Sequence, residues 1–260
     1  MNKLFHFFSA VFIGLMAASF NSCMNNDGNS NWSTFNDMAV TVSGNELDGY
    51  TLYTDFDVKL TPANLSHFPE LKSFRRARIS FNVTNESVTN VSDLDAGKTY
   101  EIQLNSVLEI PTYISCVDTL SEDYQIFGQD SIAIKNKAVW DVSQTFGQYY
   151  VKNGYLNVIP TFYYDPYSPI SFLLYYDGVQ DIDTTNRKAV FNLYFDNNTS
   201  NAYYTISSLV CFRMSDEVYS RFVQAGVNES DSVTICLNVN TQKGVVRLEY
   251  KAALNDFMLP

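Results

Sequence analysis

The chain of 260 residues carries 17 basic and 28 acidic side chains, so its formal net charge is −11. Without the first 22 residues, which contain Lys3, 16 basic side chains face 28 acidic ones and the charge becomes −12. A surface this acidic repels phosphate backbones, and we therefore predict that the protein does not bind nucleic acid. The 19 Phe and 18 Tyr, together with Gly and Pro that form no low-complexity tract, are typical of a globular, mostly β protein.

The first 23 residues have the order of a lipoprotein signal peptide. Lys3 precedes an apolar run from Leu4 to Phe20, and Ser22 and Cys23 follow. The signal peptidase needs a small residue before the cut and a lipid-modified thiol after it, so we predict a signal peptide at 1–22 and palmitate-type lipidation of Cys23. An uncleaved membrane anchor is the alternative, because an apolar run of about 17 residues is only just long enough to span a bilayer.

The segment at 23–34 is polar and predicts a flexible tether between the lipid and the folded part. Its second residue, Met24, is not the aspartate that favours retention at the inner membrane. We therefore expect anchoring at the outer membrane, on either its periplasmic or its cell-surface side.

The first predicted domain, at 35–115, is a small β-barrel. Apolar and polar residues alternate along its strands, as in the segment from Arg76 to Val83, where Ala77, Ile79 and Phe81 are expected to face inward and Arg76 and Arg78 outward. The same alternation places Phe56 on the inner face with Leu52. About five strands in roughly 85 residues, the last at 113–120, suit a small barrel.

The second predicted domain, at 116–260, is a β-sandwich with one short helix. Its strands are separated by turn signals such as Asn153-Gly154, and we expect them at 130–134, 148–151, 155–164, 170–176, 188–195, 203–214, 232–240 and 245–253. Ser215 is a suitable N-cap for a helix from Asp216 to Ala225, in which Val218 and Phe222 share one face and which Gly226 ends.

Several segments resemble the NigD-like lipoproteins over nearly the whole mature chain. They are the lipobox, LTPANLSHFPELKSFRRARISFNV, GYLNVIPTFYY, ISFLLYYD and DSVTICLNVNTQKGVVRLEY. The resemblance implies an all-β fold, with an N-terminal OB-like barrel followed by a C-terminal β-sandwich, and it implies no catalytic residues. The family name points to a bacteriocin-associated or immunity role.

The sequence offers little that is typical of an active site or a metal site. His67 is the only histidine after the signal peptide, and no GxSxG elbow, Gly-rich phosphate loop or Cys/His spacing of a metal site occurs. Asp177, Asp181 and Asp183 do not have the spacing of a calcium loop. We predict no catalytic residue, no metal and no cofactor.

The three cysteines after Cys23 can form at most one disulfide. Cys211 and Cys236 lie among β-branched residues, so a bridge between them is one interpretation, whereas buried free thiols are the interpretation that we favour.

Tyrosines beside carboxylates are the residues that best suit a ligand site. The candidate ligand-binding residues are Tyr163, Tyr164, Tyr167, Tyr176 and Asp177. Adjacent tyrosines on a strand face opposite ways, so one member of each pair is expected in the core.

From these features we predict a non-enzymatic, lipid-anchored cell-envelope protein with a binding or scaffolding role. It contacts the membrane through its N-terminal lipid and has a protein or glycan partner, and its oligomeric state is left open. A glycan-binding accessory lipoprotein is the second hypothesis, and a hydrolase is the third.

Overall fold

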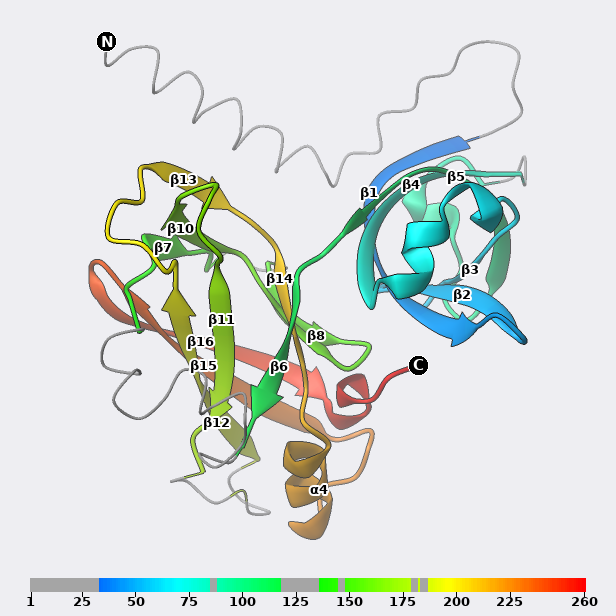
Figure 1. Ribbon diagram of the computed structural model, residues 1–260. Helices are drawn as coiled ribbons and strands as arrows, with labels where there is room; N and C mark the ends of the chain where they lie inside the picture. The colour runs from blue at the N-terminus through cyan, green and yellow to red at the C-terminus, as the bar shows by residue number, and fades with distance from the viewer. Residues whose placement is uncertain (1–32, 85–87, 118–135, 145–147, 179–181, 183–186) are drawn as a thin grey trace. The chain divides into compact units, whose positions relative to one another are not determined.

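The computed structural model describes residues 33–84, 88–117, 136–144, 148–178, 182 and 187–260. The chain divides into two compact units, Met1–Ile110 and Pro111–Pro260, and both are built from strands (Figure 1). The predicted all-β class is confirmed. The predicted signal peptide at 1–22, Cys23 and the predicted strand at 130–134 lie outside the described residues.

The first unit contains a closed five-stranded barrel. Around the barrel the strands follow the order β1 (Ser33–Asn45), β2 (Gly49–Thr54), β3 (Lys59–Pro62), β5 (Thr99–Glu109) and β4 (Arg76–Val83). Only the β3–β5 pair is parallel, and a 3₁₀ turn at Pro69–Ser73 lies between β3 and β4. β1 begins at Ser33, so the last two residues of the predicted tether belong to the barrel.

The barrel core follows the alternation of its strands. Along β4, Ala77, Ile79 and Phe81 are fully buried, as expected. Phe81 stacks on Phe35 of β1 with ring centroids 5.1 Å apart. These inward side chains meet those of the other strands, including Val40, Leu52, Leu60 and Ile102, and form one apolar cluster.

Two of the predicted orientations in the barrel were wrong. Phe56 is 53% exposed, because β2 ends at Thr54 and the chain turns at residues 55–57, where Asp57 has a φ of 64°. The Thr54 hydroxyl accepts hydrogen bonds from the N–H groups of Phe56 and Val58 and so closes this turn. Arg76, expected to face solvent, is completely buried.

The second unit contains an eight-stranded sheet and a three-stranded sheet. The larger sheet has the order β16 (Gly244–Ala253), β15 (Ser232–Thr241), β12 (Lys188–Asp196), β11 (Ser171–Tyr176), β6 (Thr112–Cys116), β14 (Val210–Arg213), β9 (Tyr155–Val158) and β8 (Tyr149–Lys152). The smaller sheet has the order β13 (Tyr204–Ser207), β10 (Pro160–Tyr164) and β7 (Asp141–Val142).

The strand expected to close the barrel belongs to this second unit. β6 pairs in parallel with β11 and with β14, and its position between them is visible in Figure 1. The compact units therefore meet at Ile110 and Pro111, within the range 35–115 that the sequence assigned to the barrel.

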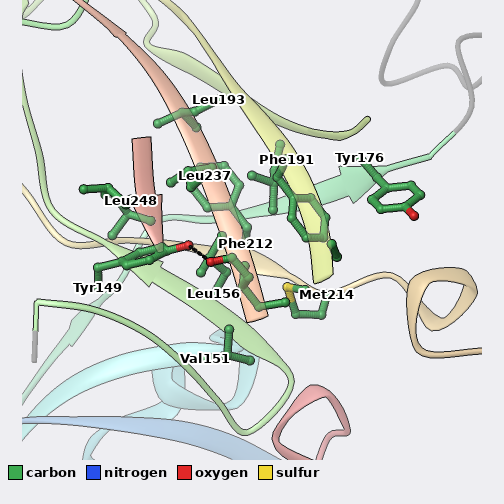
Figure 2. Packing of buried hydrophobic residues seen from close by; sticks show 14 of the residues in the cluster. Tyr149, Val151, Leu156, Tyr176, Phe191, Leu193, Phe212, Met214, Leu237 and Leu248 are labelled. Carbon is green, nitrogen blue, oxygen red and sulfur yellow. Dashed lines mark hydrogen bonds between the residues drawn. The ribbon is translucent and has the colours of Figure 1, made fainter. Parts of the chain in front are cut away.

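The eight-stranded sheet curves until its two edge strands contact each other across the core. Tyr149 of β8 packs edge to face against Tyr250 of β16, with ring centroids 6.0 Å apart, and its hydroxyl donates to the Ile235 carbonyl at 3.2 Å. Burial raises the pKa of Tyr149 well above its usual value, so the phenol stays a neutral donor. Figure 2 shows Tyr149 beside Leu156, Phe212 and Leu237 in this core.

The short helix forms where the sequence predicts it. α4 spans Asp216–Gln224, and the Ser215 hydroxyl accepts a hydrogen bond from the N–H of Glu217 at 3.1 Å. Val218 and Phe222 are its buried residues, and Gly226 follows with a φ of 78°. The cap, the apolar pair and the terminating glycine are therefore confirmed.

Candidate functional site

The five candidate residues lie at two separate places in the second unit. Tyr163 and Tyr164 end β10, and Tyr167, which is 95% exposed, lies in the loop that leads to β11. Tyr176 and Asp177 lie at the far end of β11. The six residues of that strand span roughly 16 Å, so the two groups do not meet in one site.

Tyr176 is part of the core. It is 1% exposed, its ring packs against Phe191 at 5.5 Å, and the Arg221 guanidinium lies over it at 5.5 Å. Its neighbour Tyr175 faces the other way and packs against Tyr194. The Asp177 N–H continues the strand by donating to the Val190 carbonyl at 2.8 Å. Asp181 and Asp183 lie outside the described residues.

The alternation of β10 separates a core face from a solvent face. Phe162 is buried and packs against Phe172 and Phe195, with ring centroids 5.3 Å and 5.2 Å away. Because successive side chains of a strand point to opposite faces, Thr161 and Tyr163 lie on the other side of the three-stranded sheet.

The neighbouring strands add polar and aromatic residues to that outer side. On β13, Ser207 lies opposite Thr161 and Thr205 lies opposite Tyr163, and on β7, Asp141 lies opposite Thr161. Trp140, which is 44% exposed, meets the Tyr163 ring at 87° with centroids 5.5 Å apart. We call this surface the aromatic face and define it as Trp140, Asp141, Thr161, Tyr163, Thr205 and Ser207.

Further aromatic residues lie at the end of the same sheet. Tyr164 and Tyr204 lie opposite each other in the β10–β13 ladder, with ring centroids 5.8 Å apart. Tyr204 is 57% exposed and the preceding Tyr203 is 78% exposed. Tyr164 and Tyr204 are two residues from Phe162 and Ile206 on their strands, so this pair lies on the opposite side of the sheet from the aromatic face.

A rigid loop holds the end of β10 in place. The Asn197 side chain donates to the Tyr163 carbonyl at 3.0 Å, and Asn197 in turn accepts from the Lys137 ammonium at 2.7 Å. Lys137 also contacts the Asp196 carboxylate at 3.1 Å and the Thr199 carbonyl at 2.9 Å. Asp196 and Asn197 are both buried, so this loop fixes the backbone that carries Tyr163.

The sequence singled out one residue of the aromatic face and missed five. Tyr163 was a candidate because it stands in a tyrosine cluster. Asp141 begins a two-residue strand that Trp140 directly precedes, and Thr205 and Ser207 come from a strand about 40 residues after β10. One of the missed residues could have been found from the sequence, because the alternation of β10 places Thr161 on the same side as Tyr163.

His67 and the three cysteines after Cys23 lie in the part of the chain that the structure describes. His67 lies in an exposed 3₁₀ turn at Leu65–His67 of the first unit. No three His, Cys, Asp or Glu side chains among the described residues come together as metal ligands. Cys116, Cys211 and Cys236 are buried free thiols, as the favoured interpretation predicted, and the Cys211 thiol donates to the Asn157 side chain at 3.0 Å.

Among the residues that the structure describes, no helix has the length and apolar character needed to cross a membrane.

Comparison with solved structures shows that other proteins share this fold. A toxin-related protein from Parabacteroides distasonis is 16% identical with a TM-score of 0.55, and the match covers 86% of this chain and 95% of that one. A lipoprotein from Bacteroides fragilis is 11% identical with a TM-score of 0.51, covering 85% and 96%. A NigD-like immunity protein from Bacteroides caccae is 18% identical with a TM-score of 0.47, covering 85% and 97%.

No family model and no curated protein matches the sequence. At the identities of the solved structures the likeness is one of fold. It defines the chain as an all-β protein of a type known from Bacteroides and Parabacteroides. The structure contains a closed five-stranded barrel and further sheets, in agreement with the all-β fold implied by the resemblance to the NigD-like lipoproteins.

Proposed function

We propose that the protein is a non-enzymatic lipoprotein of the outer membrane whose folded part binds or scaffolds another component of the cell envelope. The proposal joins a sequence feature, the lipid attachment signal, to a structural one, the aromatic face.

The lipid anchor is supported by the order of residues around Cys23. Each acyl methylene buried in a bilayer contributes about 0.8 kcal/mol, so two or three chains on one cysteine hold a protein stably at a membrane. The fold is also shared with a protein described as a lipoprotein in Bacteroides fragilis. Anchoring through Cys23 would keep both units at the membrane surface while leaving them free to meet a partner.

The binding role is carried by the exposed aromatic side chains of the second unit. Trp140, Tyr167, Tyr203 and Tyr204 are 44%, 95%, 78% and 57% exposed. Leaving large rings in water forgoes the free energy of their burial, and a partly exposed ring pair such as Trp140 and Tyr163 of the aromatic face suits an interaction site. A surface used for binding accounts for them.

Labelling with palmitate tests the anchor. The wild-type chain should incorporate the label and fractionate with the outer membrane. Cys23→Ser should incorporate none, because a hydroxyl cannot replace the thiol in lipid transfer, and should migrate as the larger uncleaved precursor. A wild-type chain without label would contradict the proposal.

A matched control separates loss of lipid from loss of the cysteine side chain in general. Cys116→Ser changes a buried thiol of the second unit and should leave both the label and the fractionation unchanged. If Cys116→Ser lost the label as well, the result would reflect failed export or folding, and the assignment of Cys23 would be withdrawn.

A further inference from the structure

We propose that the aromatic face binds a neutral carbohydrate chain. The inference rests on the proposed binding role and names the class of ligand. It is drawn from the combination of two ring planes, a row of hydroxyl groups and one carboxylate on the same side of the three-stranded sheet.

The two rings are arranged to contact a sugar from two sides. Trp140 and Tyr163 meet at 87° with centroids 5.5 Å apart, so their planes form a corner. The C–H groups on one face of a pyranose are apolar and pack on an aromatic ring, as other apolar groups do. A sugar stacked on one ring of this corner would touch the second ring with its edge.

The hydroxyl groups beside the rings match the polar rim of a sugar. Thr161 and Ser207 lie across the β10–β13 ladder with their side-chain oxygens 2.6 Å apart, and Thr205 follows on the same face beside Tyr163. A hydroxyl has one donor and two acceptor positions, so the bonded pair retains acceptor capacity for the hydroxyl groups of a ligand. Asp141, opposite Thr161, adds a charged acceptor.

The charge of the aromatic face selects a neutral ligand. Asp141 is the only charged member of the six residues, and the nearby Lys137 is engaged by Asp196, Asn197 and the Thr199 carbonyl. Phosphates, acidic sugars and anionic lipids need cations, which this set does not supply, and the whole chain is strongly acidic. Hydroxyl groups interrupt the rings, so the face also lacks the continuous apolar centre of a protein interface.

The backbone that carries the ring pair is held by hydrogen bonds. The backbone N–H of Trp140 donates to the Thr161 carbonyl at 2.8 Å, and the backbone carbonyl of Tyr163 accepts from the side chain of the buried Asn197. A backbone that is already held in place loses little freedom when a ligand binds, which lowers the entropic cost of association.

Tryptophan fluorescence of the full-length lipoprotein tests the inference. The chain has two tryptophans, so Trp32→Phe leaves Trp140 as the single reporter. The protein is purified in a polyoxyethylene detergent, because detergents with sugar headgroups would compete. An array of neutral oligosaccharides is screened first. Hits are then titrated, with hexagalacturonate as the acidic comparator, and we expect saturable binding of a neutral chain at roughly millimolar affinity or better.

Variants of the aromatic face locate the binding. Tyr163→Ala should weaken binding roughly tenfold or more, as truncation of a central aromatic contact does, whereas Tyr163→Phe should retain it. Tyr175→Ala is the matched control, since Tyr175 is also a half-buried strand tyrosine that packs against another ring, Tyr194. Ser207→Ala serves as a second test if Tyr163→Ala fails to fold.

Each outcome of these measurements either supports or overturns the inference. Binding of a neutral chain that Tyr163→Ala weakens and Tyr175→Ala leaves intact supports the inference. Lack of neutral hits, binding of the acidic chain alone, or equal binding by Tyr163→Ala and the wild type overturns it. Palmitate labelling of Cys23 is independent of these results, so the anchored envelope role can stand when the carbohydrate inference fails.

Discussion

The barrel of the first unit is distinguished by a buried arginine, whereas the second unit is distinguished by several exposed aromatic rings. The barrel takes a charge into its interior: Arg76 is fully buried and forms two hydrogen bonds of 2.8 Å with Asp55 and one of 2.9 Å with the Thr41 hydroxyl. The second unit fills its interior with rings and leaves Trp140 and Tyr204 exposed. Arg76 therefore serves the structure of the barrel, whereas the exposed rings of the second unit are the residues to which we assign a binding role.

The largest expected effects come from placing a charge in either core. Ile79→Asp should unfold the barrel and Leu156→Asp the second unit, because these side chains are 1% and 0% exposed and a buried unpaired charge costs several kcal/mol, a large part of a domain's stability. A calorimetric scan of each variant should retain the transition of the other unit. Loss of both transitions in either variant would show one cooperative unit and remove the distinction between them.

The next effect tests the buried ion pair of the barrel. Asp55→Ala leaves the Arg76 guanidinium without its bidentate partner and should destabilise the barrel by about 3–5 kcal/mol in urea unfolding. Replacing both residues together, with Arg76→Met and Asp55→Leu, should recover most of that loss. Asp37→Ala is the control, since Asp37 pairs with Arg78 at a half-exposed position and should cost about 1 kcal/mol or less.

A smaller effect is expected at the helix of the second unit. Ser215→Ala removes the acceptor of the Glu217 N–H and should cost about 1 kcal/mol. Ser220→Ala, within the same helix, removes only a hydrogen bond to the Asp216 carbonyl and should be neutral or slightly stabilising. Equal losses from both serines in thermal unfolding would contradict the capping role.

The smallest expected effect concerns pH. A hydrogen bond from Lys188 lowers the pKa of Glu249 below its ordinary value of 4.5, and contacts with Cys236 and Arg247 add to the shift. Because the folded pKa is depressed, the contribution to stability is complete above 4.5 and is lost as pH falls through the lower folded value. An NMR titration should find the pKa of Glu249 closer to 4.5 in Lys188→Met; an unchanged pKa would rule out the lysine as its cause.

Local sequence patterns predicted the helix and the strands well. They predicted poorly which strands and which residues would pair with one another. The apolar alternation of β4 and the cap of α4 depend on residues close in sequence, and both were predicted correctly. Arg76 was misplaced because its partner Asp55 lies 21 residues earlier, in a turn that no alternation describes. β6 was assigned to the barrel because a strand does not reveal its neighbours, which here are β11 and β14.

The sequence also predicted only part of the aromatic face, the candidate site. Tyrosine spacing identified Tyr163, but it grouped Tyr163 with Tyr176, which the length of β11 places far away and in the core. The residues that do accompany Tyr163, such as Trp140 and Ser207, reach it only through the pairing of β7, β10 and β13. A group of residues drawn from several strands depends on how those strands pair and in which register. The sequence alone did not provide that pairing.

Oxidative footprinting of the protein in native membrane vesicles tests most directly the proposal that the second unit carries the binding surface. Hydroxyl radicals modify exposed rings, so Trp140 reports on the aromatic face and the 53% exposed Phe56 on the barrel. We predict that Trp140 is modified severalfold less in vesicles than in the purified protein, while Phe56 is modified equally in both. Equal modification of Trp140 in the two preparations, with protection of Phe56 instead, would contradict the account.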